Sequence, residues 1–306
     1  MPELPEVETL ARGLQQTVAG RRIVSVTLGK TDFIDDPAAL EQHLPGQLIE
    51  RVERFGKFML MRLSNAKNGH APGDAVPGGS LLVHLGMTGH LSPHATVEPF
   101  PKHTHARFLL DDGRELRYTD ARRFGRMAYF AAENLPSELG RFGDDPLEIT
   151  EQDFAALLKL HKSRIKALLL KQSALRGVGN IYADESLWRS RIHPTRIAAR
   201  LSPEESRKLR RALQEILREA IELRGSSISD FLDAEGRPGE YQRRHRAYGR
   251  ETKPCYRCKT PIRRVIVAGR SSYFCPRCQP APKPAKRTAK RGKRVTAKGR
   301  AASYRH

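Results

Sequence analysis

The chain has 306 residues, of which 55 are Lys or Arg and 34 are Asp or Glu, so its formal net charge at pH 7 is +21. This length favours two domains, each large enough to bury its own core. No apolar run approaches about 18 residues and the acidic start is unlike a signal peptide, which excludes a membrane span and favours a soluble, cytosolic protein.

The positive charge is shared between a tail and the body of the chain. Ten basic residues and no acidic one follow Gln279, so 21 minus 10 leaves 11 positive charges on the body. Such a surface most often binds phosphate backbones, with an anionic membrane as the competing partner. The tail, 280–306, is low in complexity and poor in apolar residues, which predicts disorder. It either raises nonspecific DNA affinity or acts as an inert solubilising segment.

The opening stretch, PELPEVETL at 2–10, contains a possible reactive centre. If Met1 is removed, the chain begins with Pro2, and an α-amino group is about a tenth unprotonated at neutral pH, far more than a lysine. A secondary amine can attack a sugar carbon and form a charged iminium, which promotes eliminations on the carbons beside it. Glu3, the next residue, can deliver or accept a proton.

A helix is predicted to follow directly. Pro5 suits a first helical turn, and apolar residues recur on one face before Gly20, at Val7, Leu10, Ala11, Leu14 and Val18. Glu3 and Glu6 then lie at the helix N-terminus, where carboxylates are favourable because of the helix dipole alone. Judged by itself, a charged cap without a chemical role is the simpler interpretation.

Strands dominate the next part, with segments predicted at 22–28, 47–54, 58–63, 81–85, 106–110 and 114–118. Lys57 occupies a tight turn, where a solvated charge or a phosphate contact is expected of a lone lysine. The stretch 64–80 is rich in Gly, Pro, Asn and Ala and indicates a surface loop. The sequence DDG at 111–113 marks a hairpin turn.

Two short segments are candidates for nucleic-acid contact. Met87 stands between glycines at a strand end, where it either fills a core gap or forms an exposed apolar wedge. Arg122 and Phe124 lie together on a loop, a pattern that fits base stacking as well as an internal Arg–aromatic contact. His103 and His105 precede the hairpin, without a local sign of metal binding.

The chain becomes helical after a boundary at 131–149, which is rich in Gly, Pro and Asp. Helices are predicted from the cap at Thr150, at 165–171, at 181–189 and from the cap at Ser202 to about 223. The GVGN sequence at 177–180 would expose backbone N–H groups and the Asn180 amide at a helix start, a phosphate-binding arrangement, although Gly-x-Gly alone is weak. Segment 225–248 is predicted to be a mobile loop.

Four cysteines form the pattern C-x2-C-x16-C-x2-C, at Cys255, Cys258, Cys275 and Cys278. This spacing favours a tetrahedral zinc site on a β-hairpin over two disulfides or a redox motif. Because four thiolates leave no open position for water, the predicted cofactor is one structural Zn2+, and no redox or nucleotide cofactor is expected. Residues 268–271 are the expected turn, with Arg270 at the tip as a solvated charge or a phosphate contact.

In this order, the motifs resemble those of the bacterial formamidopyrimidine-DNA glycosylases, from Pro2 to Cys278. The resemblance rests on PELPEVET, Lys57 after Phe-Gly, HLGMTG at 84–89, YTDARRFG at 118–125, GVGNIYADESL at 177–187, GSS at 225–227 and the four cysteines. The opening is closer to the branch acting on oxidised purines than to the endonuclease VIII branch. The long 64–80 loop and the basic tail depart from the family pattern, outside its motifs.

The resemblance implies an α+β fold, with DNA in a cleft between two domains. A β-sandwich with a leading helix comes first, followed by a helical helix-two-turn-helix domain with a C-terminal zinc β-hairpin. The expected divisions are a catalytic domain, a DNA-binding domain, a lesion-recognition loop region, a zinc finger and a disordered basic tail, at 1–135, 136–224, 225–249, 250–279 and 280–306.

Roles for individual residues also follow from the resemblance alone. Pro2 is the expected Schiff-base nucleophile and Glu3 a proton donor, with Lys57 donating a proton in β-elimination and Arg270 acting in δ-elimination. The expected DNA contacts are His103, Arg122, Lys162 and Asn180. Met87, Arg122 and Phe124 match the trio that fills the gap left by an extruded base.

The function that the resemblance implies is base excision repair: a bifunctional glycosylase and lyase removes 8-oxoguanine or formamidopyrimidines from damaged duplex DNA and cleaves the abasic site by β,δ-elimination. A monomer working in the bacterial cytoplasm, at the nucleoid, is expected. The alternatives are an endonuclease VIII-like glycosylase for oxidised pyrimidines and a catalytically silent DNA-binding protein. The presence of both Pro2 and Glu3 disfavours the silent protein.

Overall fold

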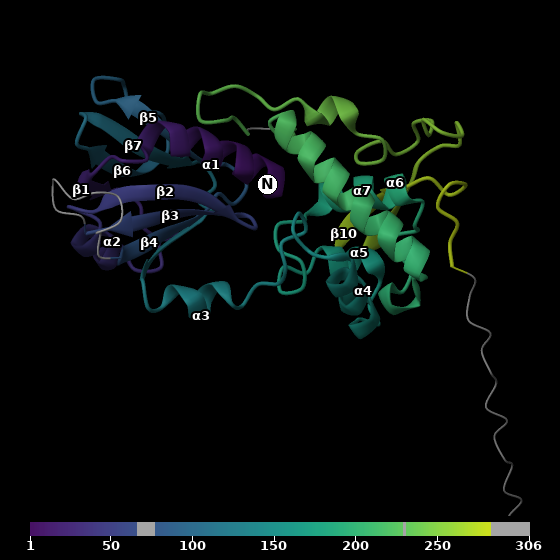
Figure 1. The fold of residues 1–306 in the computed structure, drawn as a ribbon. Helices are drawn as coiled ribbons and strands as arrows, with labels where there is room; N and C mark the ends of the chain where they lie inside the picture. Colours follow the sequence, from purple (N-terminus) through teal and green to yellow (C-terminus); the bar gives the residue numbers. More distant parts are fainter. Residues whose placement is uncertain (66–76, 229–230, 283–306) are drawn as a thin grey trace, which may run out of the picture.

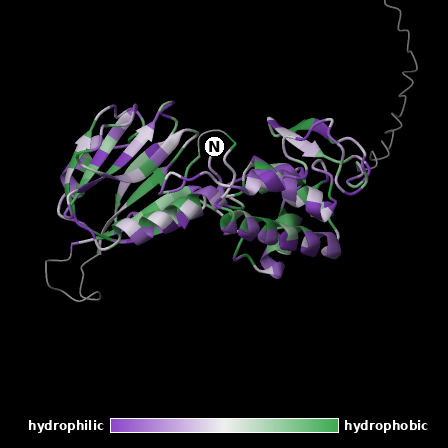
Figure 2. Cartoon of the chain, turned by 90° about the horizontal axis from the view of Figure 1, so that it is seen from above, coloured by the Kyte–Doolittle hydropathy of each residue, from purple (hydrophilic) through white to green (hydrophobic). Residues whose placement is uncertain are grey.

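The computed structural model describes residues 1–65, 77–228 and 231–282. One half of the molecule is built on β-sheets and the other on helices, and the N-terminus lies between the two halves (Figures 1 and 2). The predicted tail from residue 283 onward and most of the predicted 64–80 loop lie outside the described residues.

The N-terminal half is the expected β-sandwich, made of two four-stranded antiparallel sheets with the orders β1-β6-β7-β5 and β2-β3-β4-β8. The strands are β1 (Ile23–Leu28), β2 (Leu48–Phe55), β3 (Phe58–Ser64), β4 (Pro77–His84), β5 (Gly89–Ala95), β6 (Thr104–Leu110), β7 (Arg114–Asp120) and β8 (Arg126–Ala131). In Figure 2, hydrophilic and hydrophobic residues alternate along these strands, as expected for sheets with one buried face.

The leading helix α1 (Leu4–Val18) joins the two halves, because its side chains enter both hydrophobic cores. Leu4 packs in the core of the helical half, whereas Val7, Leu10 and Leu14 pack in the core of the sandwich. The first turn of α1 is therefore fixed at the junction between the halves, which brings Pro2 and Glu3 there as well.

The second half is helical, as predicted. Its elements are α3 (Leu135–Leu139) in the linker, α4 (Glu151–Leu160), α5 (Ile165–Leu169), α6 (Asn180–Ser190), η1 (Ala198–Arg200), α7 (Pro203–Glu222) and η2 (Tyr241–Arg244). The predicted caps are confirmed: Thr150 accepts from Asp153 N at 3.1 Å, and Ser202 forms a capping box with Glu205. Segment 225–248, predicted to be a mobile loop, includes the fully buried ring of Tyr241.

The zinc-finger hairpin consists of β9 (Arg263–Val267) and β10 (Arg270–Phe274). Ala268 and Gly269 alone make the turn, with φ values of 49° and 70°, as in the tight turns favoured by twisted hairpins. The turn predicted at 268–271 is therefore two residues too long, because residues 270 and 271 belong to β10. Arg270 is the exposed first residue of β10, paired with Val267.

The sequence analysis missed α2 (Pro37–His43) and the strands β5 and β8. The short α2 is capped by Asp36, whose carboxylate accepts from Ala39 N at 3.0 Å. None of the helices in the described ranges is both long and apolar enough to span a bilayer.

Candidate active site

The chain start is held by hydrogen bonds rather than left free. Glu3 N donates to the Glu6 carboxylate at 2.8 Å, and Leu4 N donates to Gly177 O at 3.1 Å. Pro2, Glu3 and Glu6 are all buried. The segment that the sequence marks as reactive is therefore pinned against the loop that precedes α6.

Glu3 caps the start of α6, far along the sequence from its own helix. Its carboxylate accepts from Ile181 N at 3.1 Å and from Tyr182 N at 3.5 Å. A Cβ at Gly179 would lie 2.2 Å from Glu3 Cδ, so only glycine at 179 allows this approach. The two amides that directly follow the GVGN stretch are therefore occupied by a carboxylate of the same chain.

Pro2 lines a narrow pocket of about 30 Å³ at the junction of the halves. Met87, from the sandwich half, and Ile181 and Ser226, from the helical half, border the same pocket. The position of Pro2 is therefore fixed by both halves, next to one of the predicted base-gap residues.

Glu6 is a second buried carboxyl, hydrogen-bonded to the backbone of Glu3. It accepts from Tyr182 Oη at 2.5 Å and from Ser226 N at 2.6 Å, as well as from Glu3 N. Burial, and then the nearby Glu3 charge, raise the pKa of Glu6 to about 7, although these hydrogen bonds oppose the rise. Sequence reasoning gave Glu6 no chemical role, and only its spacing of three residues from Glu3 pointed to it.

Lys57 is buried, with 8% of its surface exposed, so its interpretation as a solvated charge is wrong. Burial lowers the pKa of Lys57; Glu3 counteracts this and Arg270 adds to it. A cavity of about 240 Å³ is lined by Lys57, Lys171, Gly179 and Arg270, among others. The structure thus brings together, around one cavity, the two basic residues to which the resemblance assigns roles in elimination.

The three predicted base-gap residues are exposed, as a DNA-inserting group requires. Met87 and Phe124 are 40% and 55% exposed, respectively, which excludes the core-filling role for Met87. The Arg122 guanidinium lies 4.7 Å from the centre of the Phe124 ring. Arg122 and Phe124 therefore contact each other and are also exposed, so the two alternatives predicted for them occur together.

The remaining predicted DNA contacts are at the surface or close to it. His103 is exposed and has a positive φ of 64°, and Lys162 is exposed beyond the end of α4. Asn180 is half-buried at the start of α6, and its Oδ1 atom has no hydrogen-bond partner. Asn180 therefore lies beside the Glu3 site, next to Ile181. None of the contacts described above involves Lys162.

The four cysteines form a compact cluster whose Sγ atoms all lie within 4.8 Å of one another. Cys258 Sγ is 3.4 Å from Cys275 Sγ and 3.5 Å from Cys278 Sγ. Tetrahedral coordination with Zn–S bonds of about 2.3 Å requires sulfur–sulfur distances near ~3.8 Å, so the residues fit a zinc ion. Trp188 of α6 packs in the same small core, which attaches the zinc finger to the helical half.

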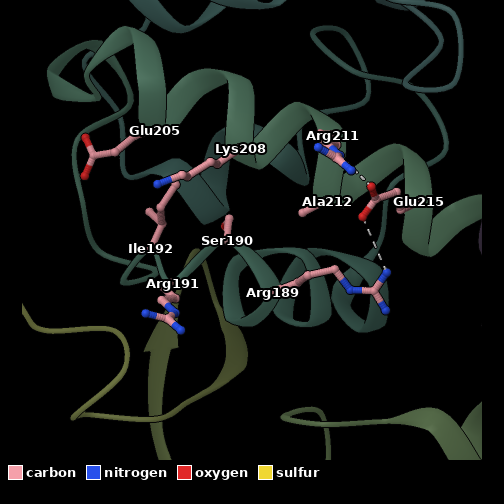
Figure 3. Close-up of a pocket in the computed structure, with 9 residues that line it drawn as sticks. All are labelled: Arg189, Ser190, Arg191, Ile192, Glu205, Lys208, Arg211, Ala212 and Glu215. Carbon is pink, nitrogen blue, oxygen red and sulfur yellow. Dashed lines mark hydrogen bonds and ion pairs between the residues drawn. The ribbon is translucent and has the colours of Figure 1, made fainter. Parts of the chain in front are cut away.

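A larger hollow of about 500 Å³ lies between the end of α6 and α7 (Figure 3). Two of its basic side chains are paired with the same acidic one, since Glu215 lies 2.7 Å from Arg211 and 3.9 Å from Arg189. None of the predicted site residues lines it. Size alone therefore does not locate the chemistry in this molecule.

Comparison with known proteins accounts for this arrangement. Family models described as the formamidopyrimidine-DNA glycosylase N-terminal domain, its H2TH domain and the zinc finger found in FPG and IleRS match residues 1–127, 142–232 and 253–281. A protein named formamidopyrimidine-DNA glycosylase, from Solibacter usitatus, is 48% identical over 281 residues, covering 91% of this chain and 99% of the relative. The chain belongs to the formamidopyrimidine-DNA glycosylase family.

Solved structures of formamidopyrimidine-DNA glycosylases share the fold. The MutM (Fpg) protein of Thermus thermophilus is 42% identical, with a TM-score of 0.77 and coverage of 91% of this chain and 98% of that one. Lactococcus lactis Fpg, solved with DNA containing an abasic site, is 31% identical, with a TM-score of 0.80 and coverage of 91% and 100%.

Membership confirms the predicted enzyme class. A formamidopyrimidine-DNA glycosylase is a bifunctional base excision repair enzyme, a DNA glycosylase that is also an abasic-site lyase. The endonuclease VIII-like and catalytically silent alternatives are not favoured. The zinc-finger match and the cysteine cluster together confirm one structural zinc.

Proposed function

We propose that this glycosylase removes 8-oxoguanine and formamidopyrimidines from duplex DNA and cleaves the resulting abasic site by β,δ-elimination. Relatives 31–32% identical were solved with DNA containing an abasic site, Fapy-dG or carbocyclic 8-oxo-G, which supports this substrate class. The observation on this chain that carries the proposal is that Pro2 and Glu3 are fixed, buried and adjacent, at the junction of the two halves.

Extrusion of the damaged nucleotide comes first. A base within a duplex cannot present its sugar C1′ to a protein amine, so the nucleotide must leave the stack, at a cost of a few kcal/mol. Met87, Arg122 and Phe124 would fill the gap, which their exposure and the stacking of Arg122 on Phe124 support.

Bond exchange at C1′ follows. The Pro2 nitrogen, freed by removal of Met1, attacks C1′ and loses its proton, while the C1′–base bond breaks and the base leaves protonated. The C1′–O4′ bond then breaks, and O4′ takes up a proton and becomes a hydroxyl. The product is an iminium between Pro2 and C1′. Glu3 is the proposed proton donor to O4′, because its two amide contacts hold the carboxyl beside the chain start.

Two eliminations then cleave the strand on both sides of the sugar, and hydrolysis of the iminium by water finally releases Pro2. Loss of a C2′ proton expels the 3′ phosphate, and a second proton loss along the sugar expels the 5′ phosphate, with the iminium as the electron sink. Lys57 is the proposed proton donor in the first step, since its lowered pKa makes its ammonium group a stronger acid than that of an exposed lysine. Arg270 is the proposed partner of the departing phosphate in the second.

The remaining assignments concern the protein as a whole. We propose that it acts as a monomer on the DNA of the bacterial nucleoid, without a membrane partner, and that His103, Lys162 and Asn180 contact the backbone. The proposed divisions remain 1–135, 136–224, 225–249, 250–279 and 280–306. Zinc, when bound by the four cysteines, holds the hairpin that carries Arg270.

Borohydride trapping tests the proposal. The protein should form a covalent adduct on duplexes containing 8-oxoguanine or an abasic site, and peptide mapping should locate the adduct at Pro2. Faster trapping at oxidised thymine than at 8-oxoguanine would instead assign the endonuclease VIII substrate class. Absence of an adduct on any of these duplexes would leave a protein that binds DNA without chemistry.

A further inference from the structure

Two loops at one end of the sandwich carry the base-gap residues. The 86–89 loop, with Met87, connects β4 to β5, and the 121–125 loop, with Arg122 and Phe124, connects β7 to β8. Each loop crosses from one sheet to the other, because β4 pairs with β8 and β5 pairs with β7. The crossings therefore lie side by side, with His84 opposite Arg126 and Gly89 opposite Asp120.

A single buried carboxylate, that of Asp120, binds both loops. Its Oδ1 accepts from Thr88 Oγ1 at 2.5 Å and from Arg122 N at 3.2 Å, and its Oδ2 accepts from Gly125 N at 2.9 Å and from Tyr118 Oη at 3.2 Å. Asp120 has no exposed surface. Four donors on one buried carboxylate satisfy it fully, so the group is fixed in place.

Thr88 closes the link between the loops. Its hydroxyl donates to Asp120 and also accepts from Arg122 N at 3.2 Å, so one side chain of the 86–89 loop contacts the backbone of the 121–125 loop. The backbones are also in close contact, because a Cβ at Gly86 would lie 2.4 Å from the carbonyl carbon of Phe124. This hydrogen bond thus joins Arg122 itself to the residue that follows Met87.

Asp120 also contacts the backbone of His103, another predicted DNA contact. Asp120 N donates to His103 O at 3.1 Å, and Asp120 O lies 3.1 Å from His105 Nε2. His103 has a left-handed backbone conformation, with φ at 64°, which a non-glycine residue adopts only at some cost. The backbone contact of Asp120 holds His103 in that conformation.

We propose that Thr88 and Asp120 form a positioning pair that fixes Met87 relative to Arg122 and Phe124, so that the three side chains enter the gap left by an extruded base as one unit. This inference rests on the proposed function. It assigns neither residue a contact with the reacting atoms. Burial, and then the Asp120 carboxylate, raise the pKa of Tyr118, which keeps its hydroxyl a donor to Asp120 and agrees with the geometry.

The test compares Thr88→Val, which removes the hydroxyl at nearly constant shape, with Thr88→Ser, which keeps it. The matched control is Thr17→Val in α1, where the lost hydroxyl bonds only to carbonyl groups of its own helix. The first readout is the fluorescence of 2-aminopurine beside a tetrahydrofuran abasic analogue in a duplex, which rises when the neighbouring stack opens and requires no chemistry. The second is borohydride trapping on a single-stranded abasic oligonucleotide, which has no helix to open.

We expect Thr88→Val to slow the fluorescence rise roughly tenfold, about the effect of one lost buried hydrogen bond. Single-strand trapping should stay close to that of the unmodified protein, and Thr88→Ser and Thr17→Val should behave normally in both assays. A normal fluorescence rise in Thr88→Val, or an equal loss in both assays, would overturn the inference. If the unmodified protein opens the duplex but forms no adduct, the proposed chemistry fails while the positioning result still stands.

Discussion

At the scale of single residues, the position of Glu3 determines what the chain start can do. Its carboxylate caps α6, so the residue next to Pro2 is fixed by a helix almost 180 positions further along the sequence, at Ile181 and Tyr182. The interpretation as a cap of the leading helix is confirmed, because Glu3 is the N-cap of α1 in a capping box with Glu6, and the same residue also caps α6. A cap made in this way also holds a carboxyl at the proposed site of proton transfer.

Gly179→Ala should disrupt this arrangement. The new Cβ would lie 2.2 Å from Glu3 Cδ, so the carboxylate must move, and misplacement of a catalytic group by about 1 Å can cost on the order of a hundredfold in rate. We expect the single-turnover rate on 8-oxoguanine DNA to fall by roughly ten- to a hundredfold. Gly29→Ala is the control, since its Cβ meets nothing closer than 3.6 Å. Equal rates for the two variants would contradict the role of Glu3.

Glu6 should make stability depend on pH. Its folded-state pKa is raised from 4.5 to about 7, so between these values the native state keeps a proton that the unfolded state has lost. The stabilisation that Glu6 provides is complete below about pH 4.5 and is lost as pH rises to about 7. The free energy of unfolding then falls by up to about 1.4 kcal/mol per pH unit. When denaturant unfolding is measured from pH 4.5 to 7, the free energy of unfolding should fall less steeply with pH in Glu6→Gln than in the unmodified protein. The exposed Glu133→Gln is the control, and an unchanged slope in Glu6→Gln would refute the buried titration.

At the scale of elements, a buried ion pair fixes the zinc hairpin to the helical core. Lys166 Nζ of α5 lies 2.7 Å from Asp184 Oδ1 of α6 and donates to Ser271 O of β10 at 2.6 Å. Tyr273 N of β10 donates to the other oxygen of Asp184 at 3.0 Å. Since Ser271 follows Arg270, this pair sets the position from which Arg270 reaches the cavity beside Lys57.

Lys166→Met should therefore affect both stability and product distribution. It leaves Asp184 buried without its partner, which typically costs about 3–5 kcal/mol of unfolding free energy. The hairpin should also be less well placed, so the ratio of δ- to β-elimination products should fall. Gel analysis of the cleaved strand and chemical denaturation measure the two effects, and Lys159→Met, at an exposed position of α4, is the control. An unchanged product ratio in a destabilised Lys166→Met protein would show that the pair supports the fold alone.

The elements differ in how far the sequence could predict them. The capped helices α1, α4 and α7 and the strands β2, β3, β6 and β7 have strong local signals, and they lie close to their predicted bounds. Strand β5 contains a proline and two histidines and forms by pairing with β7, which no local pattern reports. The burial of Lys57 likewise results from contacts made by distant segments.

At the scale of the whole molecule, the two halves are joined by charge as well as by α1. Arg54 of β2 has a buried side chain that donates to Glu8 at 2.8 Å and lies 2.8 Å from the carboxylate of Asp145 in the linker to α4. Phe55, the next residue, lies under the guanidinium of Arg176 at 4.6 Å. These contacts lie next to Lys57 and to the start of α6, so the relative placement of the halves and the geometry of the proposed site are coupled.

Removal of 283–306 tests what the basic tail adds. The deletion takes away all ten positive charges that follow Gln279 and leaves +11 on the body. We expect weaker binding to undamaged duplex at low salt and a shallower dependence of affinity on salt, because fewer counterions are released. The single-turnover rate on a bound lesion should not change. Binding isotherms at several salt concentrations measure the effect, and identical salt slopes with and without the tail would favour the inert solubilising role.

The central claim is that the Pro2 nitrogen bonds directly to deoxyribose. The most direct measurement compares protein that begins at a free Pro2 with protein that carries an acetylated Met1 ahead of it, on the same 8-oxoguanine duplex. The blocked protein should bind the duplex but give neither a borohydride adduct nor strand cleavage, whereas the free form gives both. Strand cleavage at the normal rate by the blocked protein would contradict the account.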